Sequence, residues 1–97
     1  MSKIKSEAID LLFEAILSLE SVDECYDFFE DICTIKEIKD MAQRLEVAML
    51  LDAKKNYQEI AGSTAVSTAT ISRVSKCLNY GSGGYRRAID RLGGDKK

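Results

Sequence analysis

The 97-residue sequence contains neither histidine nor proline, and these two absences narrow the possible folds and chemistries. Because proline is missing, apolar residues recur at helical spacing and no stretch alternates Val, Ile and Thr with polar residues, we predict an all-α fold. Without histidine the chain lacks the ordinary Ser–His and Cys–His nucleophile pairs, and without a strand it lacks a strand-linked phosphate loop. We therefore assign no catalytic residue and expect no enzymatic activity.

Cysteine is scarce, and its positions follow no recognised pattern. Cys25, Cys33 and Cys77 are odd in number and lack C-x-x-C spacing. Such a set predicts neither a disulfide framework nor, without histidine, a zinc site. We expect the three thiols to be buried in the core, and we predict no metal and no cofactor.

The sequence also lacks a signal peptide, and no apolar run approaches the roughly 20 residues needed to span a bilayer. We therefore expect a cytoplasmic protein that does not interact with membranes. Hydrophobic residues make up 45% of the chain, which favours a folded core over disorder. At this length we predict one small domain over residues 1–97.

The net charge of −2 conceals an uneven distribution along the chain. Residues 1–53 contain five Lys or Arg against thirteen Asp or Glu, a balance of −8, and residues 54–97 contain nine against three, a balance of +6. A nucleic acid would be attracted to the second half and repelled by the first. The alternative is that the acidic residues merely solvate the first helices.

Residues 1–53 are predicted to form a helical dimerisation and core region. The first helix, at residues 3–19, has apolar residues around most of its circumference, so it must be covered on several sides. We expect a second copy to cover it in a homodimer, with the central helix of a monomeric bundle as the alternative. Two further helices should begin at capping boxes, S-x-x-E at 21–24 and T-x-x-E at 34–37, and end near Ile32 and Ala53.

Residues 54–80 are predicted to form a helix-turn-helix. Its first helix should begin behind the capping residue Asn56 and break at Gly62 and Ser63. Its second helix should begin behind Ser67. Three apolar residues of the second helix share one face because they recur at helical spacing: Ile71, Val74 and Leu78.

The opposite face of the second helix is small, polar and basic, which suits a helix that enters the major groove of DNA. We predict that the short residues Thr68, Ala69 and Ser72 read base edges, and that longer side chains such as Arg73 and Lys76 contact phosphates. A helical hairpin with a small-residue crossing is the alternative. The predicted DNA-binding residues are Gln58, Ser67, Thr68, Ala69, Ser72, Arg73 and Lys76.

Residues 81–97 are predicted to form a glycine-rich joint and a short basic helix. Gly81 should end the recognition helix in the left-handed conformation, and residues 82–84 should form a flexible joint. The last helix, at residues 85–92, should stop at Gly93–Gly94. It carries three arginines that either contact phosphates or form a solvated basic face: Arg86, Arg87 and Arg91.

The run Ala-Thr-Ile-Ser-Arg at 69–73 resembles the Trp repressor superfamily, in particular its YerC/YecD-like branch. The similarity covers Ile32–Tyr80 and includes Thr34, the Ala-Gln-Arg-Leu run at 42–45 and residues 67–73. It implies a Trp repressor-like helical domain of about six helices whose N-terminal helices interlock in a homodimer. It also implies a transcriptional repressor that binds double-stranded DNA at an inverted repeat. The alternative is a helical protein–protein interaction module that uses the same scaffold without binding DNA.

The resemblance further implies a site for an amino-acid-like effector between Arg44 and Arg73, with Thr34 nearby. Guanidinium groups bind a carboxylate in bidentate geometry and stack on aromatic rings. The sequence departs from the family pattern at Ala65, where a glycine is usual in the turn, and at Val74, where tryptophan-binding members have glycine. Because a β-branched side chain at 74 should clash with an indole, we expect the effector, if there is one, not to be tryptophan.

Overall fold

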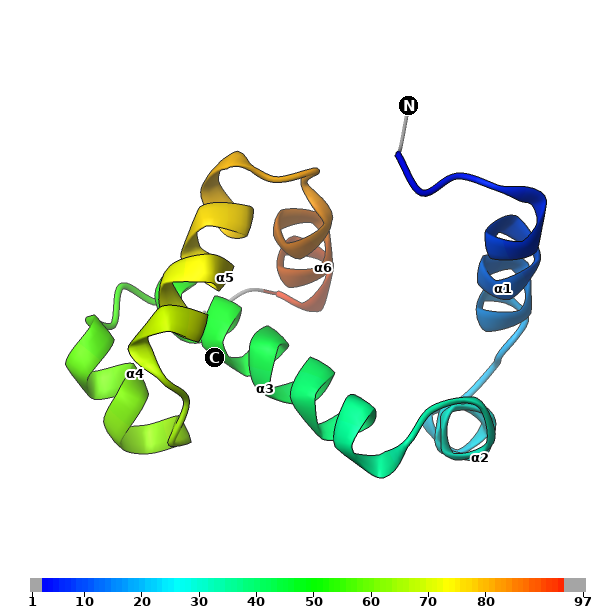
Figure 1. Ribbon diagram of the computed structural model, residues 1–97, viewed down its shortest axis with the longest axis horizontal. Helices are drawn as coiled ribbons and strands as arrows, with labels where there is room; N and C mark the ends of the chain where they lie inside the picture. The colour runs from blue at the N-terminus through cyan, green and yellow to red at the C-terminus, as the bar shows by residue number, and fades with distance from the viewer. Residues whose placement is uncertain (1–2, 94–97) are drawn as a thin grey trace. The chain divides into compact units, whose positions relative to one another are not determined.

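The computed structural model describes residues 3–93, which form six helices and no strand (Figure 1). The prediction of an all-α fold of about six helices is therefore confirmed. The helices are α1 (Glu7–Leu17), α2 (Val22–Ile32), α3 (Ile35–Asp52), α4 (Tyr57–Thr64), α5 (Thr68–Tyr80) and α6 (Gly84–Leu92). No helix among the described residues is long and apolar enough to cross a membrane.

The chain divides into two compact units, Met1–Ile38 and Lys39–Lys97, called here the N-terminal and C-terminal units. The division falls within α3, whereas the end of the first region was predicted at residue 53. The C-terminal unit contains most of α3 and all of the predicted helix-turn-helix.

Helix α1 is shorter at both ends than the predicted helix at residues 3–19. Ser6 is in an extended conformation, and its Oγ accepts the Ile9 N–H at 3.1 Å, so the helix begins only after it. At the other end the Ser18 hydroxyl donates to the Ala15 carbonyl at 2.6 Å, and Leu17 is the last helical residue. Hydroxyl groups that bond to the backbone therefore set both ends, whereas the hydrophobic pattern runs past them.

The two predicted capping boxes occur, one of them in altered form. At the start of α3, Thr34 Oγ1 accepts the Glu37 N–H at 3.0 Å and Glu37 Oε1 accepts the Thr34 N–H at 2.8 Å, which is the complete reciprocal arrangement. At the start of α2, Ser21 Oγ accepts the Glu24 N–H at 3.0 Å, but the Glu24 carboxylate accepts the N–H of Glu20.

The N-terminal unit has no buried residue in α1 or α2. In α1, Leu11, Phe13 and Leu17 expose 66%, 49% and 82% of their surface. Phe28 and Phe29 of α2 meet edge to face, with ring centroids 5.6 Å apart. The apolar surface predicted from the helical pattern is thus left uncovered within this unit.

The C-terminal unit contains the hydrophobic core. Ile60 on α4 and Ile71 on α5 are fully buried, and α4 packs against α5 while α5 packs against α6 (Figure 1). The buried residues come from α3 to α6 and from the turn between α4 and α5: Val47, Ala48, Ile60, Val66, Ile71, Val74 and Ile89. The core therefore fixes the two helices of the helix-turn-helix against each other.

The expectation that the cysteines are buried is wrong. Cys25 and Cys33 are half-buried and Cys77 is exposed. Cys77 directly precedes Leu78 of the apolar stripe on α5, and at about 100° per residue it falls outside that stripe.

The joint between α5 and α6 also differs from the prediction. Gly81 has φ −86° and ψ −154°, so it is extended and not left-handed. The left-handed residue is Gly83 (φ 87°), which directly precedes α6, and Gly84 is already helical. Helix α6 ends at Gly93, which is left-handed with φ 95°, and Gly94 lies outside the described residues.

Candidate nucleic-acid interface

Helix α4 is the first helix of the helix-turn-helix, and it begins with a complete capping box. Asn56 Oδ1 accepts the Glu59 N–H at 2.8 Å, and Glu59 Oε1 accepts the Asn56 N–H at 2.9 Å. The cap at Asn56 was predicted, but its reciprocal partner was not.

The predicted break of this helix at Gly62 and Ser63 is wrong, since α4 continues to Thr64. The Thr64 hydroxyl donates to the Ile60 carbonyl at 2.7 Å, and the Ser63 hydroxyl donates to the same carbonyl at 3.4 Å. Gly62 has open space around it, so its only unfavourable effect is the low helix propensity of glycine. The burial of Ile60 stabilises the helix by more than this propensity destabilises it.

The turn is made by Ala65, which is left-handed with φ 60° and ψ 21°. Its N–H donates to the Ala61 carbonyl at 3.0 Å, and the Val66 N–H donates to Thr64 Oγ1 at 3.2 Å. Val66 then turns into the core, where it is 8% exposed. Ala65 occupies the conformation that suits glycine, at the position where the resemblance implies one.

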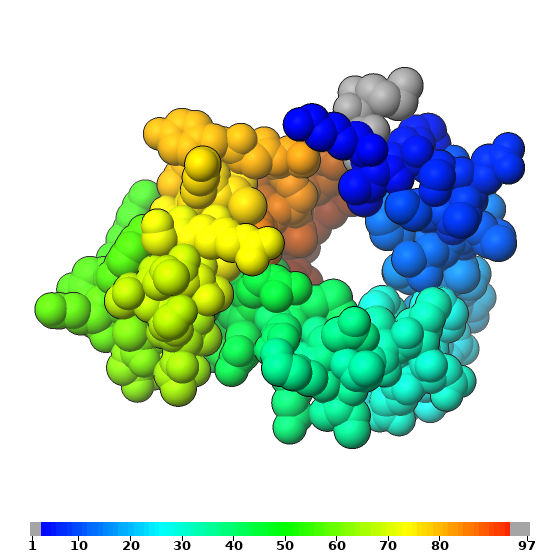
Figure 2. Space-filling model, in the orientation of Figure 1, coloured from blue at the N-terminus to red at the C-terminus, as the bar shows by residue number. Residues whose placement is uncertain are grey.

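Helix α5 begins as predicted behind Ser67, whose Oγ accepts the Thr70 N–H at 3.2 Å. Its inner side is fixed by Ile71 and Val74, which are 0% and 2% exposed. Part of α5, drawn in yellow, lies at the surface of the face shown in Figure 2. All of the predicted DNA-binding residues are exposed: Gln58, Ser67, Thr68, Ala69, Ser72, Arg73 and Lys76.

Most of the polar side chains in the predicted DNA-binding set are available to bind a ligand. Gln58, Thr68, Ser72, Arg73 and Lys76 make no side-chain hydrogen bond or ion pair to another residue in the range 3–93. The Ser67 hydroxyl, in contrast, accepts from the Thr70 N–H and lies 3.2 Å from the Thr70 hydroxyl. Its observed interactions are those of a helix cap, so of the predicted set it is the least available to DNA.

The electrostatics of this region favour an anion. The first turn of α5 contains no acidic residue, so its N–H groups and the positive end of the helix dipole are not offset there. Residues 54–93 contain seven Lys or Arg against two acidic residues. Residues 54–93 therefore carry the positive charge that phosphate binding requires.

The three arginines of α6 fall into two groups. Arg86 Nη1 donates to Asp52 Oδ1 at 2.8 Å, and Arg86 Nη2 donates to Asp90 Oδ1 at 2.9 Å. The hydrogen bond from Arg86 lowers the pKa of Asp52 against the opposing effect of burial, and the two carboxylates raise the pKa of Arg86. Arg86 thus ties α6 to the end of α3, whereas Arg87 and Arg91 are exposed and have no partner in residues 3–93.

The predicted effector residues lie in both units. Thr34 is in the N-terminal unit, where its hydroxyl is part of the α3 cap. Arg44 on α3 is half-buried, Arg73 on α5 is exposed, and neither makes an ion pair to another described residue. The side chain of Val74 packs in the core of the C-terminal unit.

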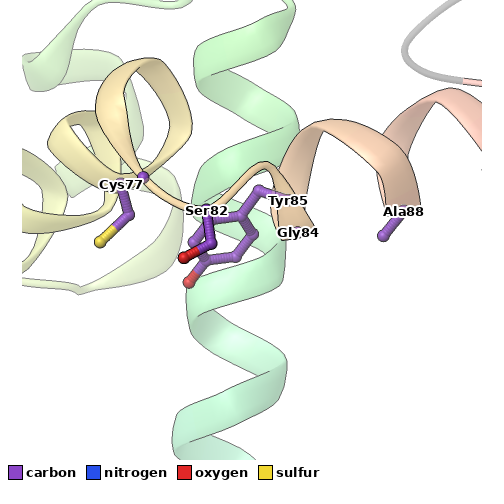
Figure 3. Close-up of a pocket in the computed structure, with 6 residues that line it drawn as sticks. Cys77, Ser82, Gly84, Tyr85 and Ala88 are labelled. Carbon is purple, nitrogen blue, oxygen red and sulfur yellow. The ribbon is translucent and has the colours of Figure 1, made fainter. Parts of the chain in front are cut away.

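An open, mostly apolar depression lies between the end of α5 and α6, and it was not predicted from the sequence (Figure 3). Its volume is about 430 Å³, and none of the predicted site residues lines it. Its lining residues are Cys77, Gly81, Ser82, Gly84, Tyr85 and Ala88. Among residues 3–93 no group of His, Cys, Asp or Glu is suited to hold a metal ion.

A second helix with free polar side chains, joined to the first by a short turn that Val66 anchors in an all-helical core, defines a helix-turn-helix protein. The chain belongs to the Trp repressor family, since the family described as Trp repressor protein matches residues 7–93. The members of this family are regulators, not enzymes.

Three similar proteins indicate more narrowly where the chain belongs within this family. It is 51% identical over 92 residues to YerC of Bacillus subtilis (strain 168), described as an uncharacterized protein, covering 95% of this chain and 88% of YerC. The crystal structure of a TrpR-like protein from Eubacterium eligens ATCC 27750 is 55% identical, with a TM-score of 0.93 and 98% of each chain covered. A candidate Trp repressor from Staphylococcus aureus is 42% identical, with a TM-score of 0.91, covering 98% of this chain and 95% of that one. The predicted relationship to YerC-like proteins is confirmed.

Proposed function

We propose that this protein is a sequence-specific DNA-binding transcriptional repressor that acts as a homodimer at an inverted-repeat operator. The observation that carries the proposal is the outer face of α5. Its polar and basic side chains are exposed and have no partner among residues 3–93, while its inner face is locked into the core by Ile71 and Val74. A rigid helix with free hydrogen-bonding groups is what base recognition in the major groove requires.

The homodimer is proposed from the surface of the N-terminal unit. Neither α1 nor α2 contains a buried residue, and Leu11 and Leu17 are among the most exposed apolar side chains. Contiguous exposed apolar surface usually marks an interface, and a closed two-fold dimer is the commonest assembly. Two recognition helices related by a two-fold axis would read half-sites centred about 34 Å apart, a spacing for which the general rule itself names the Trp repressor as an example.

Within each half-site we assign two roles to the exposed residues. Thr68, Ala69 and Ser72 are at the beginning of α5 and are short, so they suit contacts with base edges. Arg73, which directly follows Ser72, and Lys76, about one turn after Ser72, suit phosphates, as does Gln58 at the beginning of α4.

Substitution separates the two roles. Ser72→Ala should change the preferred sequence while leaving the dependence of affinity on salt almost unchanged. Lys76→Ala should weaken binding to all sequences similarly and lower the salt slope by about one unit, because one phosphate contact is lost. Both affinities are measured by fluorescence anisotropy on a selected duplex and on a scrambled duplex. Equal losses of both variants on both duplexes would refute the assignment.

We further propose that free tryptophan is not the effector. Arg44, Arg73 and Thr34 correspond to effector-site residues of the repressors that this chain resembles, but Val74 replaces their glycine. Overfilling a packed site costs about 1–3 kcal/mol, which weakens binding roughly ten- to a hundredfold. The site would then take a smaller or differently shaped amino-acid-like ligand, or the regulator would act without one.

Calorimetry tests the effector proposal. Titration with tryptophan should give no micromolar binding, and Val74→Gly should gain affinity for tryptophan if the side chain at 74 is the obstacle. Val74→Ala is the matched control, since it removes less volume and keeps a helix-forming residue. Micromolar binding of tryptophan to the unaltered protein, with stronger DNA binding as a result, would refute the proposal.

A further inference from the structure

The segment that joins α3 to α4, residues 53–56, contains two lysines that have no assigned role (Figure 1). Lys54 and Lys55 are both exposed, and neither side chain makes a hydrogen bond or an ion pair with another residue in the range 3–93. They directly precede Asn56, the capping residue of α4. We call Lys54 and Lys55 the lysine pair.

The backbone at Lys54 is in a conformation that favours glycine. Lys54 has φ 69°, and its N–H donates to the Leu51 carbonyl at 3.0 Å, while the Lys55 N–H donates to the Leu50 carbonyl at 3.1 Å. These two bonds close the end of α3 and fix the backbone of the lysine pair. A glycine at 54 would make the same bonds without the steric cost of a left-handed Cβ. The closing turn therefore does not account for a lysine at this position.

The lysine pair is not neutralised by nearby acidic residues. Between residues 53 and 89 the sequence has a single acidic residue, Glu59, and its Oε1 accepts the Asn56 N–H in the cap of α4. Asp52 precedes the pair, and Arg86 Nη1 donates to its Oδ1 at 2.8 Å. The pKa of Asp52 is lowered first by this hydrogen bond and only to a smaller extent by the charge of Lys54. Both carboxylates are thus engaged elsewhere, which leaves two positive charges at the surface.

We infer that the lysine pair binds the phosphate backbone of duplex DNA beside the half-site that α5 reads. The inference rests on the proposed function and adds a contact to it. In a helix-turn-helix the first helix crosses the DNA backbone while the second enters the major groove, so the beginning of the first helix lies near phosphates. Helix α4 packs against α5, and Gln58 in its first turn is already assigned to phosphate. The lysine pair, which precedes that turn, extends the contact along the same strand by two charges.

The two lysines are tested separately and together by fluorescence anisotropy on the selected and scrambled duplexes. Lys54→Gly and Lys55→Ala should each weaken binding to both duplexes by a similar factor, roughly three- to tenfold at about 0.1 M salt, and should each lower the salt slope by about one unit. The double variant should lower the slope by about two units. In urea denaturation Lys54→Gly should be at least as stable as the unaltered protein, because glycine relieves the left-handed strain. The weaker DNA binding would then come from a fold that is not weakened.

Two matched variants separate the charge from the backbone. Ala65→Gly makes the same backbone change at another left-handed residue but removes no charge, so it should leave the salt slope unchanged. Lys54→Arg keeps the positive charge and should retain the slope of the unaltered protein.

Two results would overturn the inference. If the double variant keeps the salt slope of the unaltered protein, while Lys76→Ala lowers it, the lysine pair does not contact phosphate although the face of α5 does. If Lys54→Gly lowers both stability and affinity, and Lys55→Ala changes neither, the lysine at 54 complements the negative end of the α3 dipole and does not bind DNA. An unaltered protein that binds no duplex would instead refute the proposed function, so the two failures can be told apart.

Discussion

At the scale of single residues, the turn of the helix-turn-helix depends on an alanine in an unfavourable conformation. Ala65 is left-handed, and a non-glycine residue in this region costs roughly 1–2 kcal/mol, partly offset by the larger entropy that a glycine loses on folding. We therefore predict that Ala65→Gly raises the free energy of unfolding by about 0.5–1 kcal/mol, measured by urea denaturation.

Gly81 provides a control for this prediction, because the reverse change, from glycine to alanine, should destabilise the protein there. Gly81 is not left-handed, and a Cβ there would meet the backbone carbonyl of Cys77. Gly81→Ala should therefore destabilise the protein, although alanine is normally the better helix former. Destabilisation by Ala65→Gly would show that φ at this turn does not limit stability.

Val74 affects both the proposed exclusion of tryptophan and the stability of the core. It is 2% exposed in the core, so Val74→Gly removes its packing and places glycine inside a helix. We predict a loss of about 3 kcal/mol in the free energy of unfolding, and a smaller loss for Val74→Ala. A loss below about 1 kcal/mol for Val74→Gly would mean that the core at this position is not close-packed.

The sequence correctly predicted the roles of individual residues whose interactions span a single helical turn. Ser21, Thr34, Asn56 and Ser67 all cap helices, because a short polar side chain needs only the N–H groups of the next turn. The exposure of Cys77 is consistent with its position outside the apolar stripe of α5, a periodicity that outweighs the general tendency of cysteine to be buried.

At the scale of elements, α6 is held by an ion pair between residues 34 positions apart in sequence. The pKa of Asp52 is lowered from its ordinary value of 3.8 by the Arg86 hydrogen bond. A depressed pKa in the folded state means that this stabilisation is complete above pH 3.8 and is lost as the pH falls through the folded-state pKa.

Substitutions at this pair should therefore reduce the acid sensitivity of folding. We predict that Asp52→Asn lowers stability at pH 7 and makes the unfolding free energy change less between about pH 5 and pH 2. In an Arg86→Gln background the same substitution should have almost no effect, because the partner is absent. An unchanged effect of Asp52→Asn in that background would contradict the role of the pair.

Helix existence was predicted from hydrophobic spacing, but several boundaries were not. The ends of α1 are set by Ser6 and Ser18, inside a longer apolar pattern. Helix α4 continues past Gly62 because Thr64 and Ser63 bond back to Ile60 and because Ile60 is buried. The role of Arg86 also escaped prediction, since no local rule links it to Asp52. Local hydroxyl bonds set the ends of α1 and help to set the end of α4, whereas the burial of Ile60 and the Arg86–Asp52 pair are tertiary contacts, which a single sequence does not display.

At the scale of the whole molecule, the account requires an obligate dimer. The N-terminal unit buries no side chain of α1 or α2, so separation of the copies would expose Leu11, Phe13 and Leu17 to water. We predict that unfolding depends on protein concentration and that no folded monomer is populated in sedimentation velocity at nanomolar concentrations. A folded monomer at low concentration would contradict this prediction.

The proposed face for DNA could be suggested from sequence because its residues lie on two consecutive helices. The depression beside α6 could not, because Cys77 and Ala88 come to line it only after the chain has turned at Gly83. The charge division between the two halves of the sequence was visible as a count. The structure shows that the compact units divide at Ile38 and not at residue 53, so that the acidic residues Asp40, Glu46 and Asp52 belong to the C-terminal unit.

The central claim is sequence-specific DNA binding by the exposed face of α5, and selection from a random duplex pool followed by salt titration tests it most directly. The account predicts an inverted repeat with half-sites about 34 Å apart, bound much more tightly than scrambled duplex, with affinity falling steeply as salt rises. Recovery of no preferred sequence, or binding to a partner protein with little dependence on salt and none to duplex DNA, would contradict it.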